Sequence, residues 1–401
     1  MKERIYMIQG KVKRKIYFTC GAVGSMINKI VPKKKNKIVF FSTTNLYDNS
    51  EALFQHLIEN EYNGSYEIVC AVRNCEDYQH LNYKNVKFIK TYHSIFHILT
   101  CKYLFYHNEM LAIRPTKKQK WVDFWHATTF KKINKMIDPE YHYDYFTYIT
   151  ATSEAFRPIF AEAFGCELER VIINGHPRND YLFDNRNELH KLNVKKEEYH
   201  KIIMWMPTYR ISFNEVLHDT DKEFIGETGI PIFLQRKQLE EFNEYLKREK
   251  VLLYIKVHPA QKREGFILED MSHIKYLFND AIEEKGIRFY SLLKQMDAIV
   301  TDYSSVFFDY LLLNRPIGFT IEDLESYGKN RGFVFENPLD YMPGAKISSV
   351  EQFYEFVNDL LMGNDKYEKE RLEINEFANY YKDNRSCQRI LDYVGLKKDG
   401  K

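Results

Sequence analysis

A hydroxyl-rich segment in the C-terminal half, TDYSS at 301–305, has residue types that can bind an anion. It follows the apolar run AIV (298–300) and precedes the apolar stretch VFFDYLLLN (306–314), an order that predicts a strand, a turn and a helix. The first N–H groups of a helix lack partners and its dipole favours negative charge, so the turn could hold a pyrophosphate. The alternative is an ordinary helix cap, because serine and threonine are common there.

Four further clusters of basic and imidazole side chains follow predicted strands. His126, in WHATTFKKI (125–133), could take a proton from an attacking hydroxyl as a neutral imidazole. Three of the clusters also have a plain alternative: a buried histidine bonded to the backbone for His126, a simple turn for GHPR, and a surface salt bridge for Arg210. Together with TDYSS, the clusters favour a cation-lined pocket for a dianionic pyrophosphate. The other three clusters are His176 and Arg178 in GHPR, Arg210 in PTYR, and Lys256 and His258 in KVHP.

A metal site is the weaker interpretation. Asp219-Thr220-Asp221 is a D-x-D pair of the kind that some sugar-nucleotide enzymes use for a divalent ion, but it lies in a polar segment and not at a strand end. The chain contains neither the GxxxxGK[ST] motif of P-loop enzymes nor GxGxxG.

Composition narrows the class of protein. The chain has 401 residues, 44% hydrophobic and 15% aromatic, which predicts about two domains with sizeable cores. The net charge of +2 argues against nucleic acid as a partner. Six cysteines without a CxxC pair or clustered histidines predict reduced thiols in a cytoplasmic protein.

The N-terminal segment, residues 1–36, is basic and partly apolar. No acidic residue occurs between Arg4 and Leu46, and the apolar run at 16–31 is too short for a comfortable transmembrane helix, which needs about 20 residues. We expect an amphipathic segment on an anionic membrane surface. An ordinary solvated helix and a signal peptide or anchor are the alternatives. The side chains expected to enter the membrane are Ile16, Tyr17, Phe18, Val23, Met26, Ile27 and Ile30.

Strand and helix signals alternate along the rest of the chain, which predicts α/β layers with parallel sheets. The charged segment 184–200 separates two such series and predicts an exposed linker. Two helices are expected at 349–363 and 367–381. We therefore expect two doubly wound domains with the ligand between the carboxyl ends of their sheets. The expected strands include 37–43, 66–72, 85–90, 121–127, 146–154, 170–180, 201–210, 251–259, 287–290, 297–305 and 316–320.

The motifs WHATTFKKI, GHPRND, MPTYR, KVHP and TDYSSVFFDYLLLNRPIGF, followed by RGFVFENPLDYMPGA and NRSCQRILDYV, occur in this order. As a set, over roughly residues 37–395, the chain resembles the CDP-glycerol glycerophosphotransferases of teichoic acid and capsule synthesis. The resemblance implies a GT-B-like fold, with two Rossmann-like domains facing a central cleft. The implied domains are an acceptor domain at 37–190, a CDP-polyol-binding domain at 191–375, and a C-terminal helix and tail at 376–401.

The resemblance also implies a reaction. Glycerol phosphate, or a related polyol phosphate, passes from CDP-glycerol or CDP-ribitol to a hydroxyl of a polyprenyl-linked saccharide or polyol-phosphate chain, and CMP is released. No cofactor or metal is expected, and the enzyme is expected at the cytoplasmic face of the membrane as a peripheral protein.

Carried over by position, His126 matches the presumed general base and His258 the histidine that contacts the donor pyrophosphate. Ala127 stands where the family usually has glycine, and Thr129-Phe130 replace Pro-Leu, so the acceptor side is expected to be shaped differently. The remaining expected substrate-binding residues are Thr301, Ser304 and Ser305 of the phosphate turn, Arg178 and Arg210, the carboxylates Asp302 and Asp309, and Lys256 as an assisting cation.

Two other functions stay open at this stage. The same fold could belong to a glycosyltransferase with a UDP- or CMP-sugar donor, or to a non-catalytic membrane-associated partner. The two histidines and the TDYSS turn favour the phosphotransferase. The choice between glycerol and ribitol, the acceptor and the oligomeric state are also open. The lack of a long extra N-terminal domain leans slightly toward a primase over a polymerase.

Overall fold

The computed structural model describes residues 2–107, 111–141, 143–208, 226–258, 266 and 268–398, with side chains described from Ile16 onward. The chain forms two compact units. The N-terminal unit comprises residues 1–127, 134–180 and 383–401, and the C-terminal unit comprises 128–133 and 181–382. This division does not test the domain limits expected from the sequence, which remain predictions.

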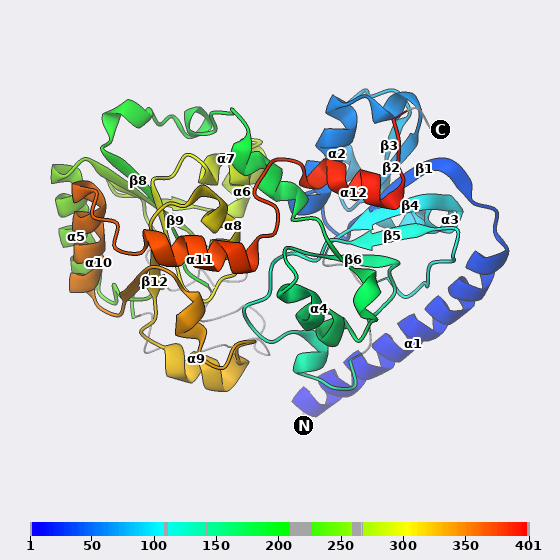
Figure 1. Ribbon diagram of the computed structural model, residues 1–401, viewed down its shortest axis with the longest axis horizontal. Coiled ribbons are helices and arrows are strands. Elements are labelled where there is room, and N and C mark those ends of the chain that lie inside the picture. Colours follow the sequence, from blue (N-terminus) through cyan, green and yellow to red (C-terminus); the bar gives the residue numbers. More distant parts are fainter. Residues whose placement is uncertain are drawn as a thin grey trace. The chain divides into compact units, whose positions relative to one another are not determined.

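In the N-terminal unit, seven strands of the described chain form one sheet in the order β3-β2-β1-β4-β5-β6-β7, with every neighbouring pair parallel (Figure 1). Strands inside the sheet, such as β2 with the sequence EIVCAV, are mostly apolar, as expected for a parallel sheet covered on both faces. Their bounds are β1 Lys34–Phe41, β2 Glu67–Val72, β3 Val86–Lys90, β4 Cys101–Tyr106, β5 Lys120–Asp123, β6 Tyr148–Ala151 and β7 Val171–Ile173.

Four helices of this unit are α2 (Asp48–Glu59), α3 (Ile95–Thr100), α4 (Phe156–Phe164) and α12 (Ser386–Val394). Helix α2 buries Leu53, Phe54 and Leu57, the apolar face that its spacing predicts. The Asp180 carboxylate accepts hydrogen bonds from the backbone N–H groups of Ser386 (2.8 Å) and Cys387 (2.9 Å). A carboxylate at a helix N-terminus satisfies unpartnered donors there, and this contact ties the returning chain to the unit.

The C-terminal unit repeats the arrangement. Six strands of its described part lie parallel in the order β10-β9-β8-β11-β12-β13. In both units the first strand lies beside the fourth, which is the Rossmann order, and a ligand binds where the strand order reverses at the carboxyl ends. The strands are β8 Lys201–Met206, β9 Val251–Lys256, β10 Ile274–Leu277, β11 Ala298–Thr301, β12 Ile317–Thr320 and β13 Ala345–Ile347.

The core of the C-terminal unit contains Trp205, Phe233, Phe242 and Phe353, whose rings contact one another. The helices expected at 349–363 and 367–381 are confirmed as α10 and α11. The helices of this unit are α5 Arg236–Arg248, α6 Asn279–Glu284, α7 Phe289–Leu293, α8 Val306–Tyr310, α9 Leu324–Arg331, α10 Val350–Met362 and α11 Glu368–Ala378.

Two expectations for this unit are wrong. The run IRFY (287–290), expected as a strand, instead leads into α7, because a short apolar run has no periodicity that separates a strand from a buried helical turn. The segment 184–200, expected as an exposed linker, includes the buried residues Glu188 and Leu189, whose N–H groups both donate to the Gln295 side-chain oxygen.

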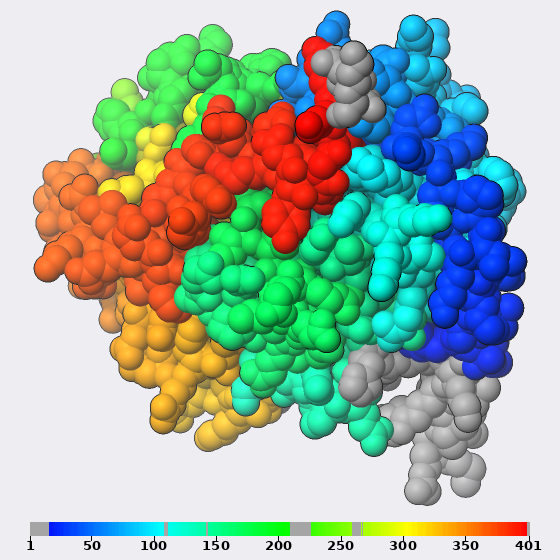
Figure 2. All heavy atoms as spheres, turned by 45° about the vertical axis from the view of Figure 1, so that its right-hand side comes forward, coloured from blue at the N-terminus to red at the C-terminus, as the bar shows by residue number. Residues whose placement is uncertain are grey.

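Helix α1 spans Lys2–Ile30, and its part from Ile16 onward lies on the surface of the N-terminal unit (dark blue in Figure 2). Its inner face is built from small residues: a Cβ added at Gly21 would stand 2.3 Å from the Ala112 Cβ. Farther along, Asn28 donates to the Gln119 side chain at 2.8 Å. Close approach at glycine seats the helix on the unit and leaves the opposite face exposed. None of the helices in the described residues combines the length and apolar character needed to cross a membrane.

Candidate active site

The carboxyl edge of the C-terminal sheet brings the loops after β8 and β11 together. The buried Asp302 carboxylate, in the TDYSS turn, accepts hydrogen bonds from the Thr208 backbone N–H at 2.7 Å and the Thr208 hydroxyl at 2.6 Å. These two loops flank the point where the strand order reverses. Asp302 therefore fixes the turn at the place where a Rossmann-like domain binds its ligand.

Two other predicted ligands of the phosphate turn lie inside the unit. The Thr301 hydroxyl donates to the Met206 carbonyl at 3.0 Å, and the Asp309 carboxylate accepts from the Tyr290 hydroxyl at 2.7 Å. Both residues are fully buried. In this geometry they support the turn from behind, and the substrate-binding role expected for them remains a prediction.

Ser304 and Ser305 are the half-buried residues of the turn, and neither hydroxyl has a hydrogen-bond partner among the described residues. The helix that follows is shorter than expected, because α8 covers only Val306–Tyr310 before a 3-10 turn ends at Asn314 in the left-handed conformation. The dipole of such a short helix stabilises an anion only weakly. An anion at this turn would therefore be bound mainly by hydroxyl groups and neighbouring cations.

His258 lies just beyond β9 on the same edge, in a pocket wall shared with Thr208. Burial and then the positive charges of Lys256 and Lys131 lower the pKa of His258 to about 4, with Asp302 acting in the opposite direction. Lys256 donates to the Asn279 side chain at 2.9 Å. The imidazole is therefore neutral at pH 7, in a site whose nearby cations favour an anionic ligand.

Lys131 was missed by sequence reasoning. It follows His126 in one motif, but residues 128–133 belong to the C-terminal unit. Lys131 pairs with Phe333 in an antiparallel bridge, and the Phe130 ring lies 5.3 Å from the Phe307 ring of α8. The motif is thus divided, and Phe130, expected to shape the acceptor side, is buried in the C-terminal unit. The sequence signal that could have identified Lys131 is its position five residues after His126, the predicted base, in the same motif.

In the N-terminal unit, His126 is exposed and follows Trp125, which has a φ of 50°. Arg178, expected to bind substrate, is buried and its Nη1 lies 2.8 Å from both Asp48 carboxylate oxygens. The same Nη1 donates to the His126 carbonyl at 2.6 Å. His176 is fully buried. The structure thus brings Arg178 to the turn that carries His126.

Arg210 and the Asp219-Thr220-Asp221 pair lie outside the described residues. Their expected roles in donor binding and metal ligation stay predictions.

His107 follows β4 in the N-terminal unit and was also missed. It is 2% exposed, and its Nε2 has no hydrogen-bond partner among the described residues. Burial lowers the pKa of His107 to about 4, Asp48 raises it and Arg178 lowers it further. The Nδ1 of the ring lies 3.3 Å from the Ser50 hydroxyl. The folded state therefore resists protonation of this ring.

A loss of stability in mild acid follows from this pKa. The pKa of His107 in the folded state lies below the ordinary 6.5. Its contribution to the free energy of unfolding is therefore complete above pH 6.5 and is lost as the pH falls toward 4. The loss between pH 7 and pH 5 is about 2 kcal/mol. In His107→Asn, the difference between the free energies of unfolding at pH 7 and pH 5, measured by urea denaturation, should shrink by this amount. His93→Ala, which changes a solvent-exposed histidine, should leave the difference unchanged; an unchanged difference in His107→Asn would contradict the assignment.

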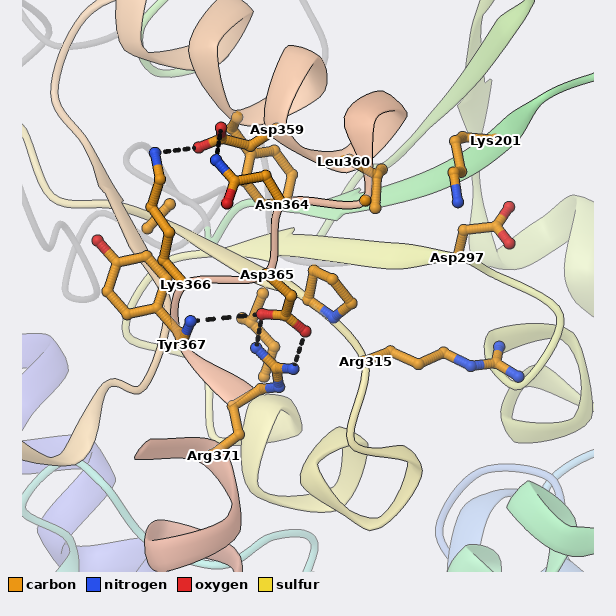
Figure 3. A pocket seen from close by; sticks show the side chains of 15 residues that line it. Lys201, Asp297, Arg315, Asp359, Leu360, Asn364, Asp365, Lys366, Tyr367 and Arg371 are labelled. Atoms are coloured by element: carbon orange, nitrogen blue, oxygen red, sulfur yellow. Dashed lines mark hydrogen bonds and ion pairs between the residues drawn. The ribbon is translucent and has the colours of Figure 1, made fainter. Parts of the chain in front are cut away.

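A cavity of about 340 Å³ lies at the amino edge of the C-terminal sheet, where Lys201 begins β8 and Asp297 precedes β11. Figure 3 shows two ion pairs in its wall: Asp365 accepts from Arg371 at 2.8 Å, and Lys366 lies 2.7 Å from Asp359. Each carboxylate in its lining is paired with a cation, and the cavity lies at the opposite edge of the sheet from TDYSS. It is therefore separate from the candidate donor site.

Comparison with known proteins finds relatives among teichoic acid enzymes. It is similar to the teichoic acid poly(ribitol-phosphate) polymerase of Bacillus spizizenii, 26% identical over 393 residues that cover 91% of this chain and 57% of the relative. It is also similar to the teichoic acid ribitol-phosphate primase of the same organism, 25% identical over 407 residues that cover 93% of this chain and 94% of the relative.

Among solved structures, the wall teichoic acid polymerase TagF superposes with a TM-score of 0.72 at 18% identity, covering 98% of this chain and 96% of that chain. This likeness shows the fold, and the predicted GT-B-like class with two parallel-sheet α/β domains is confirmed. The family model of the CDP-glycerol:poly(glycerophosphate) glycerophosphotransferases matches residues 24–396. The predicted family is thereby confirmed, and this chain belongs to the CDP-glycerol:poly(glycerophosphate) glycerophosphotransferase family.

Proposed function

We propose that the protein transfers glycerol phosphate or ribitol phosphate from its CDP-linked donor to a hydroxyl of a lipid-linked acceptor in teichoic acid or capsule synthesis. The observation that carries the proposal is the carboxyl edge of the C-terminal unit. There a neutral His258, influenced by Lys256 and Lys131, stands on the same edge as a hydroxyl-bearing turn fixed by Asp302. Cations, hydroxyls and a neutral imidazole N–H are the groups that bind a pyrophosphate without competing negative charge.

In the proposed reaction, the acceptor hydroxyl gives its proton to His126 and its oxygen forms a bond to the β-phosphorus of the donor. The bond from that phosphorus to the oxygen of the departing CMP breaks, and CMP carries the electron pair away. His258 donates an N–H to the phosphates, and Lys256, Lys131 and the serine hydroxyls stabilise the charge that develops. Positioning and electrostatic stabilisation account for most of the rate in phosphoryl transfer.

CMP release from CDP-glycerol and from CDP-ribitol, with a polyprenyl-pyrophosphate disaccharide as acceptor and EDTA present, tests the proposal. Acceptor-dependent release from one donor would support it, name the polyol and show that no added divalent ion is needed. Release only after EDTA is replaced by Mg²⁺ would overturn the metal-independent form. If neither CDP-linked donor releases CMP and a UDP-sugar instead releases UDP, the result would favour the glycosyltransferase.

We also propose that the exposed face of α1 rests on an anionic membrane surface at the cytoplasmic side. Ile16, Val23, Ile27 and Ile30 are spaced by seven, four and three residues, so they share one helix face, opposite Gly21 and Asn28. Ile30 is 82% exposed. Basic residues at 33–35 follow the helix. An exposed apolar face beside lysines fits a lipid surface, which offers both hydrocarbon and negative charge.

The double substitution Val23→Glu and Ile27→Glu is expected to weaken binding to vesicles containing phosphatidylglycerol by at least about tenfold, because it replaces inserted apolar side chains with anions. Vesicle co-sedimentation at low and high salt measures the effect, and salt should weaken wild-type binding. Leu372→Glu, at an exposed apolar residue of α11, is the matched control. Equal binding of the double variant and the control would refute the membrane role of α1.

A further inference from the structure

The backbone that carries His126 has an unfavourable conformation. Trp125 has a φ of 50°, in the left-handed region that bulky residues rarely adopt. Its N–H donates to the Asp123 carboxylate at 2.8 Å. Such a conformation persists only where the surroundings impose it, and it commonly occurs at functional sites. The contacts that impose it here identify the residues that control the position of His126.

Further contacts to this part of the backbone come from residues at the N-terminus of α2. Asn49 donates to the Trp125 carbonyl at 3.4 Å, and its side-chain oxygen accepts the Arg178 backbone N–H at 3.2 Å. Asp48 accepts from Arg178 Nη1 with both oxygens at 2.8 Å, and the same Nη1 donates to the His126 carbonyl at 2.6 Å. Asn49 is fully buried and Arg178 is 5% exposed.

The two carbonyls define the geometry of the histidine. The Trp125 carbonyl belongs to the peptide plane before the His126 Cα, and the His126 carbonyl belongs to the plane after it. Holding both planes fixes φ and ψ of His126 and hence the direction of its Cα–Cβ bond, which leaves only the side-chain torsions free. Asp48 is needed because a buried guanidinium without its carboxylate is strongly disfavoured.

We propose that Asp48 and Asn49 are positioning residues that act through Arg178 and the backbone to aim His126 at the acceptor hydroxyl. The proposal rests on the proposed function, in which His126 is the base. A displacement of about 1 Å in a reacting group can cost roughly 100-fold in rate. Loss of either residue should therefore lower the rate of the chemical step without touching the donor, which is bound by the C-terminal unit.

Asp48→Asn is the first variant to test. Asparagine tolerates the left-handed φ of 58° at this position, so the substitution removes the charge and keeps the backbone. We expect kcat for CMP release to fall about 10- to 100-fold, with the KM for CDP-glycerol changed by less than about twofold. Asp48→Glu, which retains the carboxylate, should recover part of the rate. Glu76→Gln, which removes an exposed carboxylate paired with Lys90 at 2.7 Å, should not alter kcat.

A second pair of measurements separates positioning from general stability. Asn49→Asp removes the donor to Trp125 and keeps an oxygen for the Arg178 N–H, so it decides the question if Asp48→Asn fails to fold. Asp48→Asn or Asn49→Asp is then combined with His126→Ala in single-turnover assays. If they act through His126, the second substitution should add little to the residual rate of His126→Ala.

The outcomes distinguish this inference from the proposed function. Near-wild-type kcat in folded Asp48→Asn and Asn49→Asp, with His126→Ala inactive, would overturn the positioning role and leave the function standing. A full additional loss on the His126→Ala background would also overturn it, since that indicates a structural effect independent of the base. Absence of turnover in the wild-type protein, or full activity of His126→Ala, would instead overturn the proposed function.

Discussion

Replacing His126 by alanine is expected to lower turnover of a CDP-polyol donor by roughly 10²- to 10⁴-fold, the usual contribution of a general base. The imidazole is exposed, and the turn that carries it is held by Arg178. Without a base, the acceptor hydroxyl must lose its proton to water. Donor affinity should change little, because the groups that we propose to bind the phosphates belong to the other unit. CMP release and calorimetric titration with CDP-glycerol measure the two quantities.

His80→Ala is a suitable control for this variant, since His80 is an exposed histidine of the same unit. Its turnover should equal that of the wild type. A His126→Ala enzyme that retains wild-type turnover would remove His126 from the mechanism, and one that loses donor affinity instead would assign it to binding.

Replacing His258 by alanine is the second large effect, with turnover expected to fall roughly 10²- to 10³-fold, as for the loss of one preorganised hydrogen-bond donor to developing charge. In contrast to His126→Ala, this variant should also bind CDP-glycerol more weakly. His258 has a pKa of about 4, so at pH 7 it is a neutral N–H donor and not a cation. His258→Gln, which keeps an N–H donor, should retain more activity than His258→Ala.

The donor itself supplies a further check on His258. A bound pyrophosphate brings negative charge toward the ring and should raise its pKa, so donor binding near pH 5 should be accompanied by proton uptake that His258→Ala lacks. Calorimetry in buffers of different ionisation enthalpy measures this uptake. His273→Ala, at the amino side of β10, is the control. Unchanged turnover and unchanged proton uptake in His258→Ala would place the donor elsewhere.

The family, the layered α/β architecture and the main strands could be predicted from the sequence because these features depend on local pattern. IVFF (38–41) and VLLYI (251–255) are apolar without interruption, which is what a parallel strand covered on both faces requires. Motif order along the chain was sufficient to identify the family. Short elements are harder to predict: β13 has three residues, and the run IRFY predicts a strand where the structure begins α7, because so few positions carry no periodicity.

The sequence by itself determined which residue types stand at the ends of strands, and therefore that His126, His258 and TDYSS could do phosphoryl-transfer chemistry. Only the tertiary structure decided how each polar group is used. Arg178 pairs with Asp48, 130 positions away, Asp302 holds Thr208, and Lys131 belongs to the unit of His258 although it follows His126. The spacing along the chain shows that a side chain lies at the carboxyl edge of a sheet. Its hydrogen-bond partner comes from a distant segment, and that partner decides whether the side chain can bind a substrate or supports the fold.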